Sequence, residues 1–131
     1  MGNAQSIPRI HFEELQDKLS SIQQNDFCLI NTMEETCQQC LIQHTIHIST
    51  EEESINKLLK KNQIKKQIIL YGKNYHDPKV IKKYNQLTHL GFKDVRIFFG
   101  GMFEWLCLHE IYGKDLFPII SSGTIDLLKY K

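Results

Sequence analysis

Apolar positions follow two periods that alternate along the chain. Short, nearly continuous apolar runs predict strands buried on both faces of a sheet, and they span 27–30, 67–71 and 94–99. Elsewhere apolar residues recur every three or four positions, which predicts amphipathic helices at 12–22, 50–59, 77–91 and 102–111. The alternation predicts a three-layer α/β/α fold around a central, mainly parallel sheet of about five strands.

The remaining segments complete the expected organisation. Residues 33–43 have the pattern of a short helix or loop, and 44–49 alternate between apolar and polar residues, which predicts a strand. We expect a free N-terminal segment at 1–6, one domain at 7–118, and a C-terminal extension at 119–131 whose apolar residues dock on the domain.

Several helix ends have recognisable sequence signals. Thr50 and Glu53 form a T-x-x-E capping box, which predicts that a helix begins there. Asp77 followed by Pro78 predicts another start, with the carboxylate as the cap and proline in the first helical position. Gly91 is expected to end that helix.

Composition limits the classes of function. The net charge is only +1, with 41% hydrophobic and 24% charged residues, so there is no electrostatic reason to expect binding to nucleic acid. No apolar run is long enough to span a bilayer, which favours a cytoplasmic protein. The abundance of Ile, Lys, Asn and Gln is typical of AT-rich genomes, such as those of some protists and large DNA viruses.

The first residues fit a lipidation signal. Met1-Gly2-Asn3-Ala4-Gln5-Ser6 matches M-G-x-x-x-[ST], in which the α-amine of Gly2 receives a myristoyl group. One such chain gives only weak, reversible membrane binding. Neither a polybasic run nor a cysteine lies within the first ten residues, so stable membrane association would require a partner.

The cysteines and histidines permit a second kind of chemistry. Four cysteines without a secretory signal predict free thiols in a reducing compartment; they are Cys28, Cys37, Cys40 and Cys107. Cys37, Cys40, His44 and His47 give the pattern C-x2-C-x3-H-x2-H, which suits zinc by ligand type or a redox C-x-x-C by its first half. The short spacing and the expected strand at 44–49 disfavour a shared metal.

Three stretches resemble the rhodanese family. Residues 27–33 stand where that family has a strand ending in an aspartate-centred turn, and 67–71 where the strand before the catalytic loop ends. The most specific stretch is Leu90-Gly91-Phe92-Lys93-Asp94-Val95 with Phe99-Gly100-Gly101 and Trp105, which is similar to an L-G-F-x-x-V … G-G-x-x-x-W ending.

The resemblance implies a catalytic loop after the central strand, in which active members carry a cysteine that accepts sulfur as a persulfide. The corresponding loop here consists of Gly72, Lys73, Asn74, Tyr75, His76, Asp77 and Pro78. Gly72 takes the place of the cysteine, and Asp77 stands where an arginine often helps to hold an anion. Asn31 replaces the common aspartate, and Met33 a common basic residue. These departures imply loss of sulfur transfer.

We therefore expect a catalytically inactive, rhodanese-like binding or scaffolding protein with no cofactor and no catalytic residue. A protein partner, a weak membrane tether at Gly2 and a viral or host-modulating role are parts of this expectation, with a peripheral-membrane or virion location beside the cytoplasmic one. Two alternatives stay open: an enzyme with altered, non-cysteine chemistry at the loop 72–77, and a zinc or redox module at Cys37, Cys40, His44 and His47.

Overall fold

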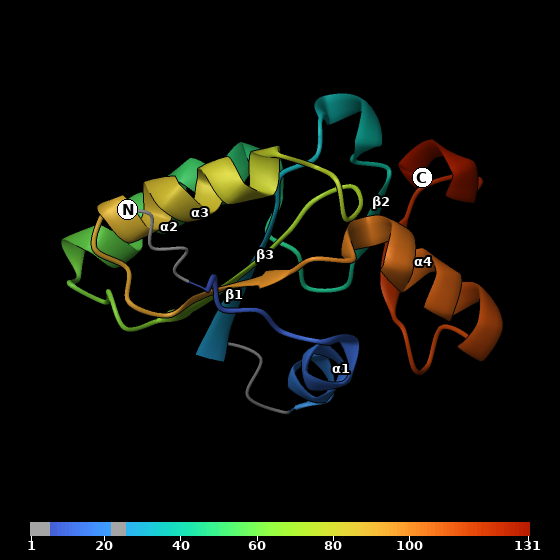
Figure 1. Ribbon diagram of the computed structural model, residues 1–131, viewed down its shortest axis with the longest axis horizontal. Helices are drawn as coiled ribbons and strands as arrows, with labels where there is room; N and C mark the ends of the chain where they lie inside the picture. Colours follow the sequence, from blue (N-terminus) through green and yellow to red (C-terminus); the bar gives the residue numbers. More distant parts are fainter. Residues whose placement is uncertain (1–5, 22–25) are drawn as a thin grey trace.

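A three-stranded parallel sheet forms the centre of the molecule (Figure 1). The computed structural model describes residues 6–21 and 26–131, so Gly2 and the apolar Ile22 lie outside the described residues. The strands β1 (Phe27–Asn31), β3 (Gln67–Tyr71) and β4 (Val95–Phe98) are arranged in the order β1-β3-β4. All three strands were predicted from their apolar runs, and β3 has the predicted bounds.

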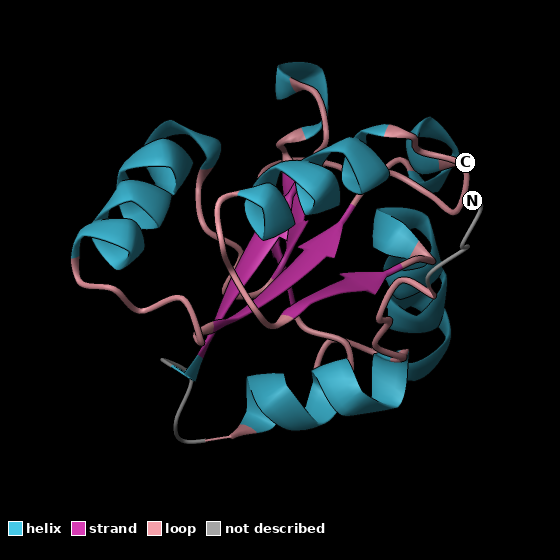
Figure 2. Cartoon of the chain, turned by 60° about the vertical axis from the view of Figure 1, so that its left-hand side comes forward, coloured by secondary structure: helices cyan, strands magenta, loops and turns pink. Residues whose placement is uncertain are grey.

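Helices cover both faces of this sheet (Figure 2). The helices α2 (Ile48–Lys60) and α3 (Lys79–His89) pack on one face, and α1 (Phe12–Ser20) and α4 (Gly101–Tyr112) pack on the other. The predicted α/β class with helices in two outer layers is confirmed.

Alternation along the strands explains why both faces are covered. In β3, Ile68 and Leu70 join the core under α2 and α3, whereas Ile69 and Tyr71 join the core under α1 and α4. All four side chains have no exposed surface. Successive residues of a strand point to opposite faces, so a strand that is apolar throughout requires a helical layer on each side.

The described residues form five strands, as expected, but these strands are divided between two sheets and do not lie in one. Two further strands, β2 (Cys40–Ile42) and β5 (Ile119–Ser121), pair antiparallel in a separate small sheet. The sequence interpretation missed β2, which lies in the segment 33–43 after the short 3-10 helix η2 (Glu35–Cys37). Its partner comes from the C-terminal segment, so no local pattern could reveal the pairing.

The segment 119–131 packs on the body through this small sheet and through the 3-10 helix η3 (Leu127–Tyr130). Its principal anchor is Tyr130, which is 2% exposed and joins the core under α4. Ile120 and Leu128, two of the apolar residues expected to dock, are exposed instead.

The predicted strand at 44–49 is wrong. His44 adopts a positive φ of 72°, and Thr45 bonds back to the carbonyl of Ile42 through both its N–H and its hydroxyl, which closes a turn. One isolated bridge, between Leu29 and Thr45, is all that remains of strand pairing in this segment.

The predicted capping box at Thr50 and Glu53 is also wrong, because the helix begins earlier. The cap of α2 is His47, whose Nδ1 accepts a hydrogen bond from the N–H of Ser49 at 3.2 Å. Thr50 already lies inside the helix, and its hydroxyl donates to the carbonyl of His47. The alternating pattern of 44–49 thus reflects a turn followed by the first helical residues.

The ends of α3 agree better with the sequence. The helix begins at Lys79, with Pro78 in the cap position, and Oδ1 of Asp77 accepts the N–H of Lys79 at 3.0 Å. The carboxylate thus binds the start of the helix, but the predicted assignment is one residue out, because Pro78 is the cap and Lys79 is the first helical residue. Gly91, at φ 108°, follows the last turn.

Within residues 6–21 and 26–131, no helix combines the length and the apolar character needed to cross a membrane.

Candidate functional site

The loop 72–78 leaves the carboxyl end of β3, the central strand, and leads into α3. Ligands of open α/β sheets bind at this edge. The first residues of α4 hold the loop from the other side: the N–H of Met102 donates to the carbonyl of Gly72 at 2.9 Å, and that of Phe103 donates to the carbonyl of Lys73 at 3.0 Å. The loop backbone is therefore fixed against a helix start.

Gly101 makes this close approach possible. Its φ is 68°, a left-handed conformation, and a Cβ at this position would lie 2.7 Å from the carbonyl oxygen of Gly72 and 3.0 Å from the nitrogen of Asn74. Both neighbours are backbone atoms, which cannot rotate away. Only glycine satisfies both requirements.

The carboxylate of Asp77 folds back into the loop. Its Oδ2 accepts the N–H of Lys73 at 3.0 Å, and its Oδ1 accepts the N–H of Lys79 at 3.0 Å. One side chain thus satisfies a backbone donor at the start of the loop and another at the start of α3. These are the groups that would otherwise face a bound anion.

Gly72 lies directly against that carboxylate. A Cβ on Gly72 would lie 2.7 Å from Oδ2 of Asp77 and 3.0 Å from its Cβ. The backbone of Gly72 is outside the left-handed region, so only the lack of space excludes a side chain here. The position where the family resemblance implies a cysteine therefore has no room for one unless Asp77 moves.

The other loop residues have structural roles or face solvent. Asn74 accepts the N–H of His76 at 2.9 Å and donates through Nδ2 to the carbonyl of Tyr130 at 3.1 Å, which ties the loop to the C-terminal segment. The His76 ring is exposed and meets Tyr75 edge-on, with the ring centroids 5.4 Å apart. Tyr75 is 65% exposed.

The turn after β1 is also closed by its own side chains. Asn31, 2% exposed, accepts the N–H of Met33 at 3.0 Å and exchanges two hydrogen bonds with the amide of Gln38. Met33 is buried. An aspartate at position 31 would lose the hydrogen bond that Nδ2 donates, so the asparagine suits its partner Gln38.

The four cysteines are unpaired, as the sequence predicts, and none of them belongs to the loop 72–78. Burial raises the pKa of Cys28 and raises the pKa of Cys40 to about 11, so both are neutral thiols near pH 7 and are weak nucleophiles. Cys37 is buried in the core under α4. Cys107, on α4, is partly exposed.

The described residues do not assemble the zinc site weighed from the sequence, and the burial of both cysteines disfavours the redox alternative. Cys37 and Cys40 are buried, whereas His44 and His47 are exposed. The His47 ring is engaged at the start of α2. The described part of the chain contains no group of three or more His, Cys, Asp or Glu side chains placed to hold a metal ion.

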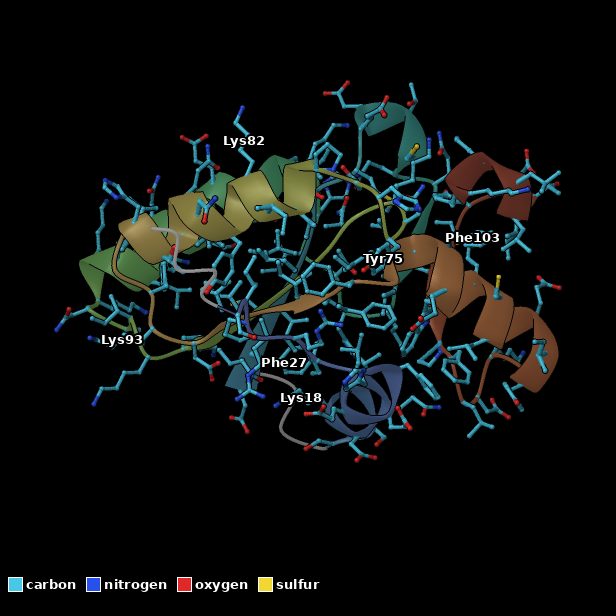
Figure 3. The ribbon with its side chains drawn as sticks, in the orientation of Figure 1. Lys18, Phe27, Tyr75, Lys82, Lys93 and Phe103 are labelled. Carbon is cyan, nitrogen blue, oxygen red and sulfur yellow. The ribbon has the colours of Figure 1, made fainter. Side chains whose placement is uncertain are left out.

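A large groove, which the sequence analysis did not identify, opens beside the loop. Its volume is about 770 Å³, within the range of ligand-binding cavities. Four parts of the chain line it with a predominantly apolar surface: residues 9–13, residues 74–76, residues 98–100 together with Phe103, Glu104 and Cys107, and Lys131. Figure 3 labels two of these side chains, Tyr75 from the loop and Phe103 from α4.

Four formally charged residues line the groove: Arg9, Glu13, Glu104 and Lys131. The guanidinium of Arg9 lies over the ring of Phe99, 4.7 Å from its centroid. Partial burial raises the pKa of Glu104, an effect that the nearby His11 reduces and Glu13 reinforces. The carboxylate of Glu104 therefore lies in a less polar environment than a carboxylate in open water.

No protein family and no curated protein matches the chain by sequence. Solved structures do match. The rhodanese-like domain of the Anabaena protein Alr3790 aligns with a TM-score of 0.61 at 17% identity, over 92% of this chain and 89% of that one. The As-Sb reductase of Leishmania major gives 0.60 at 18%, over 82% and 79%.

The single-domain sulfurtransferase RDL2 of Saccharomyces cerevisiae aligns with a TM-score of 0.53 at 16% identity, over 89% of this chain and 100% of that one. Identities this low establish the fold alone. The chain has a rhodanese-like fold, as the three sequence stretches predicted. The activities of these proteins do not transfer to it.

Proposed function

We propose that this chain is a rhodanese-like binding module that does not transfer sulfur. The observation that carries the proposal is the carboxylate of Asp77, which accepts the N–H of Lys73 and lies 2.7 Å from the position of a Cβ on Gly72. A covalent sulfur carrier needs both a nucleophile and free backbone donors to stabilise its anion. Position 72 has no nucleophile, and the carboxylate of Asp77 already accepts the hydrogen bond from the N–H of Lys73 in the loop.

No other cysteine substitutes for the missing one. Cys28 and Cys40 are neutral near pH 7, because burial raises the pKa of each thiol. Cys37 is enclosed in the core. Cys107 lies on α4 in the lining of the groove and does not belong to the loop. The carboxylate of Asp77 occupies the loop as an anion of the protein itself. The same geometry therefore argues against the alternative of an enzyme with non-cysteine chemistry on an anionic substrate at this loop.

The binding role rests on the groove beside the loop. A concavity with a predominantly apolar surface and some polar groups in its lining is the ordinary form of a ligand site. We propose that the protein acts as a scaffold that binds a protein partner, and that a myristoyl group at Gly2 tethers it weakly to membranes. A viral or host-modulating setting agrees with the composition and forms part of the same proposal.

A thiosulfate-to-cyanide sulfurtransferase assay tests the loss of chemistry. We expect thiocyanate formation equal to the protein-free blank, with an active rhodanese as the positive control. Turnover at ordinary enzymatic rates, on the order of 1 s⁻¹ or above, would overturn the proposal. The Cys107→Ser variant then identifies whether that thiol carries the activity.

Intact mass spectrometry tests the tether separately. Protein co-expressed with an N-myristoyltransferase is expected to gain about 210 Da, the mass of a C14 acyl group. The matched control is Gly2→Ala, which removes the acceptor and should leave the mass of the unmodified chain.

A further inference from the structure

We propose that the groove beside the loop is the resting site of the myristoyl chain on Gly2 of the same molecule. The inference builds on the acylation proposed above and assigns the acyl chain a place in the fold. In this arrangement the chain is either folded into the groove or released to a membrane or partner.

The lining of the groove suits a saturated chain. Phe12, Phe99, Phe103 and Cys107 are partly exposed there, over the buried Phe98. The groove volume of about 770 Å³ falls within the roughly 300–1,000 Å³ typical of cavities that enclose a small-molecule ligand. Partly exposed aromatic rings in a concave surface gain from any apolar occupant that excludes water.

The connection between Gly2 and the groove runs through residues that the structure holds in place. Residues 9–13 form part of the groove lining, the N–H of Ile97 donates to the carbonyl of Pro8, and Ile7 packs against the core under α2 and α3. Gly2 stands five residues before Ile7, and an extended chain spans at most about 3.3–3.6 Å per residue, so this stretch reaches roughly 16–18 Å. The acyl chain adds its own length beyond Gly2, and the arrangement that we propose leaves residues 7–13 in place.

The charges favour an amide-linked chain over a free fatty acid. Glu13 and Glu104 line the groove together with Arg9 and Lys131, so the opposite charges balance. Arg9 already rests on the ring of Phe99. A free carboxylate would gain no excess of positive charge here, whereas a myristoyl amide is neutral along its length.

Sequestration has a measurable consequence for membrane binding. A single exposed myristoyl chain binds a bilayer with a constant on the order of 10⁴ M⁻¹. If the chain occupies the groove nine-tenths of the time, the apparent affinity falls about tenfold, in proportion to the free fraction. Occupation of the groove would thus hold the protein off the membrane.

The first test measures protection of Cys107 in the wild-type chain. Acylated and Gly2→Ala proteins are labelled with a maleimide, and peptide mass spectrometry follows each cysteine. Cys28, partly exposed but outside the groove, is the internal control. We expect acylation to slow labelling of Cys107 at least fivefold and to leave Cys28 unchanged. Equal rates at Cys107, or absence of the acyl group after co-expression, overturn the inference.

The second test fills the groove. Acylated Cys107→Trp places a large ring where the chain would lie, and we expect about tenfold tighter binding to phosphatidylcholine vesicles in a sedimentation assay. The matched control is Ile111→Trp on the same helix, at a residue that is 71% exposed and outside the groove. If Cys107→Trp binds no tighter than the control, the groove does not hold the chain.

These tests are independent of the proposed loss of sulfur transfer. The thiosulfate assay uses unmodified protein and reports on the loop alone. A negative labelling result with a blank sulfurtransferase assay therefore removes the acyl site and leaves the non-catalytic proposal in place. If Cys107→Trp does not fold by circular dichroism, the labelling experiment on the wild-type chain decides the inference.

Discussion

The loop after β3 and the groove beside it share residues 74–76 but are built in opposite ways. In the loop, the carboxylate of Asp77 satisfies backbone donors and leaves no room for a side chain on Gly72. In the groove, aromatic side chains from separate segments leave about 770 Å³ open. The protein thus fills the polar loop with its own carboxylate, whereas the neighbouring apolar groove stays open.

This difference indicates how two neighbouring regions of one fold can be filled or left open by different means. A single carboxylate is enough to occupy a backbone cradle, because an anion at a helix start is stabilised by the same donors that would hold a substrate. A groove formed by rings needs no such cradle. The two regions should therefore respond differently to substitution.

The largest effect is expected where the loop meets α4. Gly101→Ala should lower the free energy of unfolding by about 3 kcal/mol, from a left-handed backbone and a Cβ pressed on the backbone of Gly72. Gly113→Ala is the matched control, since Gly113 also has positive φ but has no atom within 4 Å of its Cβ position. It should cost about 1 kcal/mol in urea unfolding. Equal costs for the two variants would contradict the close packing.

The next effect tests whether Asp77 excludes a side chain at position 72. Asp77→Ala removes two hydrogen bonds to backbone N–H groups and should cost about 2 kcal/mol. Gly72→Cys should also cost about 2 kcal/mol by overpacking. In the double variant the clash is gone, so its loss of unfolding free energy should be about 1–2 kcal/mol smaller than the sum of the two single-variant losses. Strict additivity in denaturant titrations would show that the two residues do not compete for space.

A smaller effect on stability is expected in the groove. Phe103→Ala removes a partly exposed ring, so it should cost only about 1 kcal/mol, while the backbone hydrogen bond from Phe103 to Lys73 remains. Its effect on binding should be larger, because the ring forms part of the groove lining. Thermal unfolding and the Cys107 labelling assay on the acylated variant measure the two effects separately. A loss of stability as large as that of Gly101→Ala would contradict this prediction, because it would show that the ring of Phe103 contributes to the core.

The smallest effect concerns pH. Partial burial raises the pKa of Glu104, so the folded protein favours the protonated carboxyl, and stability contributed by this proton is lost as pH rises through the folded pKa. Glu104→Gln, which stays neutral, should be slightly more stable than wild type at pH 7, by less than about 0.5 kcal/mol for an exposed side chain. Below the ordinary pKa of 4.5 the difference should vanish. A larger advantage at low pH would contradict the direction of this shift.

The sequence predicted the central part of the fold because its signals are local. Continuous apolar runs identified β1, β3 and β4, and Asp77 with Pro78 identified the start of α3 to within one residue. The glycine at position 72 was also visible in the sequence. The contact between Asp77 and Gly72 depends on how the loop turns, which spacing alone does not determine.

The features that the sequence missed depend on distant residues or on competing local options. The small sheet pairs Cys40–Ile42 with Ile119–Ser121, two three-residue strands that carry no pattern of their own. His47 caps α2 in place of the predicted capping box at Thr50, because the chain turns at His44 and Thr45 and the helix begins earlier. The groove collects side chains from four segments, so its existence follows from packing and from no single motif.

The pairing of β2 with β5 has a consequence for the order in which the chain can acquire its structure. The strands of the parallel sheet β1-β3-β4 all precede α4, so they are synthesised first, but the face that carries Ile69 and Tyr71 stays uncovered until α4 is present. The segment around Cys37 to Ile42 must wait, because β5 and the ring of Tyr130 arrive about 80 to 90 residues later. Pairings of such long sequence separation form slowly. The edge of β2 therefore stays without its partner until β5 has been synthesised, and an unpaired strand edge can pair with another chain.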